Sequence, residues 1–160
     1  QSDNTHPTDA NENIVFSELL SDIITAAELD ISEKELQIKT DLHSHTNFVG
    51  DKVLLTRALE NILVNAIKYS PKHSTIELSA QQEGQALVLQ IHDEGPGIPE
   101  QEIDSILKPF FRADKSRNRG TGGFGLGLAI TDSIIRQHKG TITLANRPDS
   151  GLTVRIVLPL

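Results

Sequence analysis

The chain has 160 residues, of which 37% are hydrophobic and 23% are charged, a composition typical of one globular domain with a sizeable core. It contains no cysteine, which excludes disulfides and thiolate metal sites, and its formal net charge of −7 argues against a general nucleic-acid-binding protein. No apolar run is long enough to span a membrane, and no signal-peptide pattern occurs.

The N-terminal part divides into a polar segment and a helix. Residues 1–13 lack a hydrophobic period and are predicted to be a disordered tail or the remnant of a linker, which leaves residues 14–160 as the domain. From Ile14 to Leu29, apolar residues recur at helical spacing, with Ser17 or Asn13 as the capping residue. The sequence contains no methionine, not even at its start, so we expect it to be excised from a longer protein.

A long helix follows two short extended elements. A strand is predicted at Glu35–Leu42 and a short apolar element at Phe48–Val49. Asp51 stands where it can cap a helix, and this helix must end before Pro71 because proline disfavours a helical residue in front of it.

One side of this helix carries unusual polar residues. At about 100° per residue, Asn61, Asn65 and Lys68 lie within roughly 60° of one another, opposite an apolar side. Carboxamide oxygens can ligate Mg²⁺, and a lysine can meet a phosphate. The alternative is an ordinary surface helix with two incidental asparagines.

The second half mixes strands and helices without a regular βαβ rhythm. This favours an α/β (α+β) two-layer sandwich, with helices on one face of a mixed sheet, over a doubly wound fold. Two strands are predicted at Thr75–Ala80 and Ala86–His92, joined by a turn at Glu83–Gly84, and the second is expected to be an interior strand. A short helix at Glu100–Leu107, a loop at Lys108–Phe124 and a helix at Gly125–His138, closed by Gly140, follow. The chain ends in a hairpin of Thr141–Ala145 and Leu152–Leu158 around Arg147–Gly151.

Two glycine-rich stretches suggest ligand binding. Asp93, Gly95 and Gly97 follow the interior strand, where a carboxylate can accept a hydrogen bond from an exocyclic amine, although a plain turn is the alternative. Residues 120–127 lead into a helix whose free N–H groups favour an anion, although a flexible linker is the alternative. Residues 120–125 match GxGxxG, but a basic loop and not a strand precedes them, so a dinucleotide fold is not expected. That loop, Lys108–Arg119, holds five basic residues and one acid, which suits a small anionic ligand.

The histidines do not indicate a metal site. His43 and His45 could share a strand face, but the sequence offers no third ligand nearby. We expect His73, His92 and His138 to be surface or structural residues.

Taken in order, four stretches resemble the catalytic, ATP-binding (HATPase) domain of bacterial two-component sensor histidine kinases, of the GHKL or Bergerat superfamily. ENILVNAIKYSP is similar to the asparagine box, DEGPGIP to the first glycine box, KPFFRAD to the phenylalanine box and GTGGFGLGLAI to the second glycine box. The closing GTITLANRPDSGLTVRIVLP is similar to the family's terminal hairpin. The resemblance covers residues 16–160, and it implies a Bergerat ATP-binding fold with a mobile ATP lid over residues 108–124.

The resemblance also implies roles for single residues. Asn65 would ligate Mg²⁺, Asn61 would support the phosphates or the ion, and Lys68 would contact phosphate. Asp93 would hydrogen-bond the adenine amine, and Arg112 would be the main phosphate cation of the lid. The implied catalytic set is Asn61, Asn65, Lys68 and Arg112. The implied nucleotide contacts are Asn61, Asn65, Lys68, Tyr69, Asp93, Gly95, Gly97, Ile98, Phe110, Arg112, Lys115, Gly122, Gly123, Phe124, Gly125, Leu126, Gly127 and Leu128.

The implied function is binding of Mg-ATP and donation of its γ-phosphoryl group to a histidine on a separate dimerisation domain, which is absent here because none of the six histidines lies in an H-E/D-x-x-T/N-P-like motif. The implied partners are that dimerisation and phosphotransfer domain and a downstream response regulator. We expect a monomeric fragment of a homodimeric phosphoprotein, and a cytoplasmic domain of a bacterial inner-membrane sensor.

Two departures from the family pattern bear on the chemistry. ATP-hydrolysing relatives carry a glutamate base where this chain has Asn61, so attack by water should be slow. Phe124 stands where many members have Ser or Thr, which removes one hydroxyl contact to phosphate. The alternative functions are a nucleotide-binding regulatory module without phosphotransfer and a stand-alone GHKL serine kinase.

Overall fold

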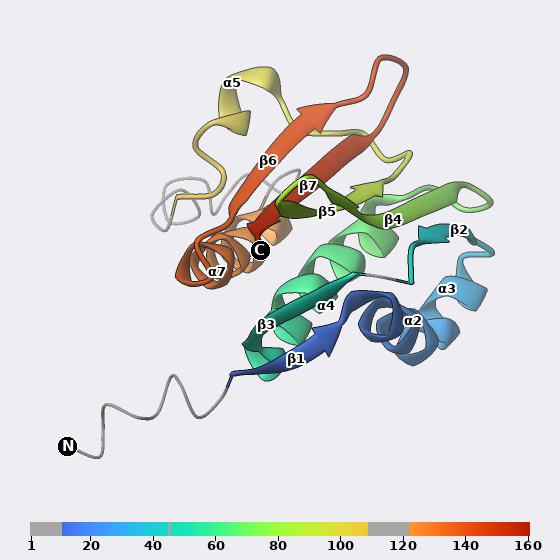
Figure 1. The fold of residues 1–160 in the computed structure, drawn as a ribbon. Coiled ribbons are helices and arrows are strands. Elements are labelled where there is room, and N and C mark those ends of the chain that lie inside the picture. The colour runs from blue at the N-terminus through green and yellow to red at the C-terminus, as the bar shows by residue number, and fades with distance from the viewer. Residues whose placement is uncertain (1–10, 45, 109–121) are drawn as a thin grey trace.

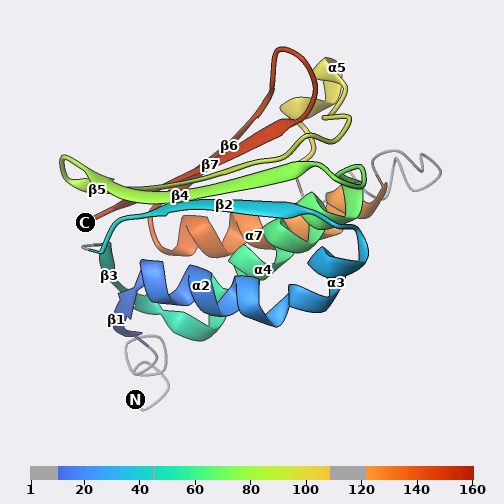
Figure 2. The same cartoon turned by 90° about the vertical axis from the view of Figure 1, so that its right-hand side faces the viewer.

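The fold has two layers, a five-stranded sheet and a set of helices that cover one of its faces (Figures 1 and 2). The computed structural model describes residues 11–44, 46–108 and 122–160, with residues 122–126 as helical backbone only. The sheet has the order β2 (Gln37–Leu42), β4 (Thr75–Glu83), β5 (Ala86–His92), β7 (Leu152–Pro159) and β6 (Thr141–Asn146). Only β2 and β4 pair in parallel, so the sheet is mixed and the predicted sandwich is confirmed.

The helical layer consists of α2 (Phe16–Ala26), α3 (Glu28–Glu33), α4 (Lys52–Tyr69) and α7 (Gly122–Gln137), and the short α5 (Glu100–Ile103) lies beyond the end of β6 (Figure 1). A second, two-stranded antiparallel sheet of β1 (Asn11–Val15) and β3 (Asn47–Asp51) lies at the edge of this layer. None of the helices built from described residues is both long enough and apolar enough to cross a membrane.

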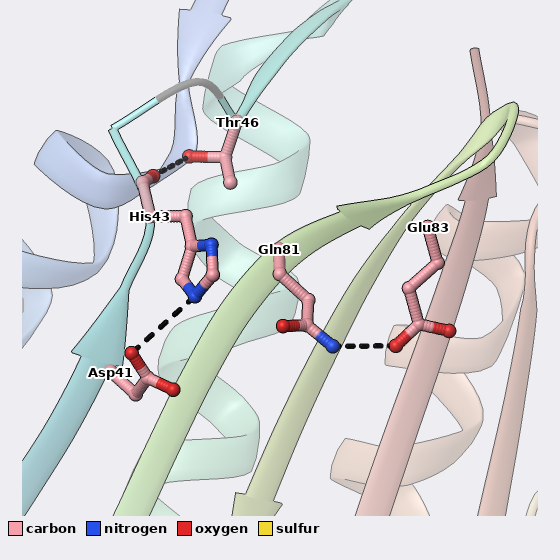
Figure 3. Close-up of polar contacts among 5 residues, drawn as sticks. All are labelled: Asp41, His43, Thr46, Gln81 and Glu83. Atoms are coloured by element: carbon pink, nitrogen blue, oxygen red, sulfur yellow. Dashed lines mark hydrogen bonds and ion pairs between the residues drawn. The ribbon is translucent and has the colours of Figure 1, made fainter.

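The core lies between the two layers. Alternate residues of β4 (Ile76, Leu78 and Ala80) are buried against the helices, as the two-residue period of a strand requires. β5 occupies the centre of the sheet, which confirms the prediction of an interior strand. The opposite face is polar near its edge, where Gln81 Nε2 donates to Glu83 Oε2 at 2.6 Å and His43 Nε2 lies 3.5 Å from Asp41 Oδ1 (Figure 3).

The N-terminal predictions need correction. Residues 11–13, assigned to a tail, pair with β3 in the register Asn11↔Asp51 and Asn13↔Val49. The predicted single helix is two helices that meet at Ala27, and the first begins only at Phe16.

Neither predicted residue caps α2. The N-cap residue is Val15, which makes no side-chain capping bond. Instead the N–H of Phe16 donates to Thr46 O at 2.8 Å, and the N–H of Ser17 donates to Thr46 Oγ1 at 3.1 Å. The same hydroxyl donates to His43 O at 2.9 Å (Figure 3). The N-terminus of α2 is therefore capped by a residue 29 positions after Ser17.

The second half differs from prediction mainly at helix ends. The short helix stops at Ile103, and α7 begins at Gly122, three residues before the predicted start. At the other end of α7 the left-handed residue is Lys139 (φ 65°) and not Gly140. The N–H of Gly140 donates to Ile135 O and that of Lys139 to Arg136 O, both at 2.9 Å, which is a Schellman cap.

The long helix α4 is as predicted. Asp51 Oδ1 accepts from the N–H of Leu54 at 3.1 Å, and the helix ends at Tyr69. His138 joins α7 to the start of α4, because its Nδ1–H donates to Ile134 O at 2.8 Å and its Nε2 accepts from the N–H of Asp51 at 3.0 Å. The structural role predicted for this histidine is confirmed.

Candidate functional site

Helix α4 carries a buried carboxamide toward α7. Asn65 is 8% exposed, whereas Asn61 is half-buried and Lys68 is exposed. A Cβ built on Gly127 of α7 would lie 3.7 Å from Asn65 Nδ2, so the carboxamide faces a position without a side chain. Among the described residues Nδ2 has no hydrogen-bond partner, and such a buried donor is unfavourable unless a ligand or water satisfies it.

The C-terminus of α4 is held by a lysine from outside the predicted set. Lys34 Nζ donates to three main-chain oxygens, those of Ile67 (2.8 Å), Lys68 (2.9 Å) and Ser70 (2.6 Å). A cation at this end also complements the helix dipole. Lys34 therefore fixes the end of α4 where Lys68 and Tyr69 lie, and Lys68 Nζ lies 5.4 Å from the centroid of the Tyr69 ring.

Asp93 is a buried carboxylate at the end of β5. It is 4% exposed, and its Oδ1 accepts from the N–H groups of Gly95 (2.8 Å) and Leu152 (3.2 Å). Burial raises the pKa of the Asp93 carboxyl above its ordinary value, and these two hydrogen bonds and the Arg147 guanidinium offset the rise only in part. Both of these hydrogen bonds go to Oδ1, so Oδ2 is the oxygen that can accept from a ligand.

Two glycines after Asp93 are required by their surroundings. A Cβ on Gly95 would lie 2.6 Å from Tyr69 O, so this loop lies directly against the end of α4. Gly97 has φ +78°, and a Cβ there would overlap Oδ1 of Asn146. The predicted adenine-binding loop therefore has a conformation that requires glycine at these two positions, because any side chain there would clash with its neighbours.

The sequence analysis missed the residues that hold this loop. Asn146, Arg147 and Ser150 all make side-chain hydrogen bonds to the main chain between Asp93 and Ile98. The sequence placed Arg147 and Ser150 only in a hairpin turn and assigned no element to Asn146. Lys34 gave no signal at all because its three partners lie 33 to 36 residues away.

One cavity brings several predicted residues together. Asn65, Asp93 and Leu128 line it, with about 10 Å³ of space for the centre of a water molecule. This is close to the minimum for a single water, so a purine can enter only if the walls move apart. The other lining residues, which the sequence did not single out, are Ile62, Ala66, Ile91, Leu152 and Val154.

The remaining predicted residues are distributed around this cavity or fall outside the described residues. Gly95, Gly97 and Ile98 form the loop after Asp93, and Lys68 and Tyr69 lie at the adjoining end of α4. Phe110, Arg112 and Lys115, and with them most of the predicted lid, lie outside the described residues. Gly122, Gly123, Phe124, Gly125 and Leu126 form the first turns of α7 and not a loop, and only their backbone is described.

Comparison with known proteins identifies the family of the chain. The profile of the family described as histidine kinase-, DNA gyrase B- and HSP90-like ATPases matches residues 50–160. The sensor-like histidine kinase SenX3 of Mycobacterium tuberculosis is 36% identical over 152 residues, which are 95% of this chain and 36% of that protein. The sensor histidine kinase CpxA of Escherichia coli is 40% identical over 111 residues, which are 69% of this chain and 24% of that protein.

The same architecture occurs among solved structures. The catalytic domain of the histidine kinase ThkA, in a nucleotide-free form, superposes with a TM-score of 0.82 at 24% identity, covering 93% of this chain and 97% of that chain. The chain therefore belongs to the family of histidine kinase-, DNA gyrase B- and HSP90-like ATPases. It spans little more than a third of the length of SenX3.

Proposed function

We propose that this chain is the catalytic domain of a sensor histidine kinase, which binds Mg-ATP and donates the γ-phosphoryl group to a histidine of a separate dimerisation domain. The observation that carries the proposal is one cavity lined by two buried polar groups, the Asp93 carboxylate and the Asn65 carboxamide, whose Nδ2 has no hydrogen-bond partner among the described residues. Its relatives SenX3 and CpxA are named as sensor histidine kinases, which supports the same reaction.

Asp93 would recognise the base. Its Oδ1 is occupied by two N–H groups, which fixes the carboxylate and leaves Oδ2 to accept from the exocyclic amine of adenine. Gly95, Gly97 and Ile98 would form one wall of the base site, and Leu128 of α7 would contribute to the other. Tyr69 would flank the nucleotide from the end of α4.

The side chains present are of a kind that can ligate a magnesium ion. The Asn65 carboxamide is buried and has an unpartnered end, and a half-turn of the amide presents its oxygen in place of its nitrogen. Asn65 would hold the ion and Asn61 would support it from one helical turn earlier, with Lys68 near the phosphates. When bound, Mg²⁺ would neutralise charge on the phosphate oxygens.

The lid and the first turns of α7 would bind the phosphates. Arg112 is the main candidate cation and Lys115 a second one, with Phe110 as an anchor of the lid. The free N–H groups of the first turn of α7, which begins at Gly122, suit an anion because they lie at the positive end of the helix. The missing hydroxyl at Phe124 makes these N–H groups more important.

The chain is poorly equipped to pass the phosphoryl group to water. Asn61 stands where ATP-hydrolysing relatives have a glutamate, and an amide cannot accept the proton of the attacking water. The adjacent Glu60 is exposed on the opposite flank of α4 from the cavity residues. A histidine nucleophile supplied by the dimerisation domain does not require such a base, since its neutral imidazole attacks directly.

The partners and the cellular setting belong to the proposal as well. The acceptor domain would be part of the same longer protein, which would be a homodimer at the bacterial inner membrane with this domain in the cytoplasm. A response regulator would then receive the phosphoryl group on an aspartate.

Calorimetric titration with ATP, with and without Mg²⁺, tests the first half of the proposal. We expect binding that tightens with Mg²⁺ in the intact chain and is lost in Asp93→Asn, while the exposed control Asp22→Asn binds normally. Phosphotransfer from radiolabelled ATP to a supplied dimerisation domain tests the second half. ATP binding without transfer would favour the regulatory module, and transfer to serine would favour a stand-alone serine kinase.

A further inference from the structure

The turn between β6 and β7 holds the loop after Asp93 from outside. Arg147 Nη1 donates to Asp93 O at 3.0 Å, and Ser150 Oγ donates to Gly95 O at 2.7 Å. The third contact, from Asn146 to Ile98, involves both ends of a carboxamide. The conformation of residues 93–98 is therefore imposed by a hairpin about 50 residues further along the chain, and only partly by the loop itself.

Asn146 makes the most complete of these contacts. Its Oδ1 accepts from the N–H of Ile98 at 2.9 Å, and its Nδ2 donates to the carbonyl of Ile98 at 2.7 Å. The second Nδ2 hydrogen is directed to Glu100 Oε2 at 3.0 Å. Because the amide oxygen has a donor as its partner and the amide nitrogen has acceptors, the orientation of the amide is fixed. The side chain at the end of β6 thus bonds to the main chain of the loop as a neighbouring strand would.

Gly97 and Asn146 are complementary in shape. Gly97 has φ +78°, and a Cβ at that position would overlap Oδ1 of Asn146. The main chain of the loop therefore lies so close to the Asn146 carboxamide that only glycine fits at position 97.

The main chain of Asn146 connects the same residue to Asp93. In the β6–β7 ladder Asn146 pairs with Leu152, and the N–H of Leu152 donates to Asp93 Oδ1 at 3.2 Å. Leu152 also lines the cavity with Asp93. One residue thus fixes both the recognising carboxylate, through β7, and the wall formed by Gly97 and Ile98.

We propose that Asn146 is a positioning residue that sets selectivity for adenine over guanine nucleotides, by fixing the loop wall at Gly97–Ile98 relative to the Asp93 carboxylate. This inference rests on the proposed nucleotide binding. Adenine presents an amine where guanine presents a carbonyl oxygen, and a carboxylate attracts the first and repels the second. The discrimination depends on holding the base edge against Oδ2, so a loosened wall lets guanine shift away from the repulsion and lets adenine lose its hydrogen bond.

The test compares the affinities of Mg-ATP and Mg-GTP, measured by calorimetry, in the intact chain and in Asn146→Ala. We expect ATP binding to weaken about 10-fold or more, as for the loss of one or two hydrogen bonds, while GTP binding changes less than about threefold. The matched control is Thr143→Ala, an exposed residue of the same strand, which should change neither affinity. Ser150→Ala, which removes only the contact to Gly95 O, should lower the ATP-to-GTP ratio by a smaller factor and serves if Asn146→Ala does not unfold cooperatively.

A double-mutant cycle separates positioning from general stability. Asn146 and Ser150 hold the same loop, so the double variant Asn146→Ala/Ser150→Ala should lower the ATP-to-GTP ratio by less than the product of the two single effects, whereas losses at independent sites would simply multiply. An equal loss for both nucleotides, or an unchanged ratio in both Asn146→Ala and Ser150→Ala, would overturn the inference alone. An intact chain that binds no ATP would contradict the proposed function and the inference together.

Discussion

Asp93 is kept in an environment that disfavours its own charge. Its pKa is raised by burial, and the hydrogen bonds from Gly95 and Leu152 compensate only in part. At neutral pH, the ionised form of Asp93 is therefore less stable in the folded chain than in the unfolded chain. Buried carboxyls whose pKa is raised are common at ligand-binding and catalytic sites, which agrees with the role that we propose for Asp93.

The first prediction concerns this residue. Because the folded pKa of Asp93 lies above its unfolded value of 3.8, the folded state binds the proton more tightly, and the free energy of unfolding falls as pH rises through that window. Asp93→Asn retains an oxygen acceptor for both N–H groups and carries no charge. We expect it to be more stable than the intact chain above the raised pKa, with the difference vanishing at the acid end, in urea unfolding between about pH 3 and pH 8.

The control for this prediction is Asp22→Asn, an exposed aspartate on α2. Its difference from the intact chain should show no such window. A stability gain in Asp93→Asn that grows as the pH is lowered would contradict the assignment of burial as the dominant cause.

At the scale of elements, the sequence predicted those whose signals are local. The cap of α4 by Asp51, the end of α4 before Pro71 and the interior strand β5 all depend on residues close in sequence. The start of α2 was mispredicted because its capping groups belong to Thr46, which joins the helix only in the folded chain. The loop after Asp93 was identified, but its support by Asn146 was not, for the same reason.

Thr46 provides a second prediction. Thr46→Ala leaves the main-chain acceptor of Phe16 in place but removes the hydroxyl that accepts from Ser17 and donates to His43 O. We expect a loss of about 1 kcal/mol in the free energy of unfolding, the usual effect of losing a helix cap. Urea unfolding measures it, and Thr40→Ala, exposed on β2, should differ little from the intact chain.

Lys34 provides a third prediction, at the other end of the helical layer. Lys34→Met keeps the aliphatic part of the side chain but leaves the carbonyls of Ile67, Lys68 and Ser70 without their donor. We expect a loss of about 1–2 kcal/mol, discounted from three charged hydrogen bonds because water reaches this partly exposed site.

The outcome at Lys34 has a specific control. Lys39→Met, on exposed strand β2, removes an equal charge without touching α4 and should change the free energy of unfolding by less than about 0.5 kcal/mol. Equal effects of the two variants would mean that net charge, and not the cap of α4, accounts for the loss.

At the scale of the whole molecule, the candidate site lies where the two layers meet. Asn65 and Leu128 come from the helices, whereas Asp93 and Leu152 come from the sheet. A ligand in this cavity touches both layers. If this is the nucleotide site that we propose, ligand binding and global stability are coupled, because the ligand binds the folded chain alone.

The fourth prediction measures that coupling. Mg-ATP at about 100 times its Kd should raise the free energy of unfolding by about 2.7 kcal/mol, since it binds the folded chain alone. For a domain of this size that corresponds to a rise in Tm of roughly 5–10 °C, detectable by differential scanning calorimetry. Asp93→Asn should show no shift under the same conditions, although it starts from a higher Tm.

The hydrogen bond between the N–H of Leu152 and the Asp93 carboxylate joins residues 59 positions apart. A ribosome releases the chain from its N-terminus, so the helices, β4 and β5 emerge well before β7 exists. Until that strand is made, Asp93 has neither its second donor nor the turn that shapes the loop behind it. A nascent chain lacking β7 should therefore be unable to retain nucleotide, and ATP binding becomes a marker that β7 has been made and has paired with β5.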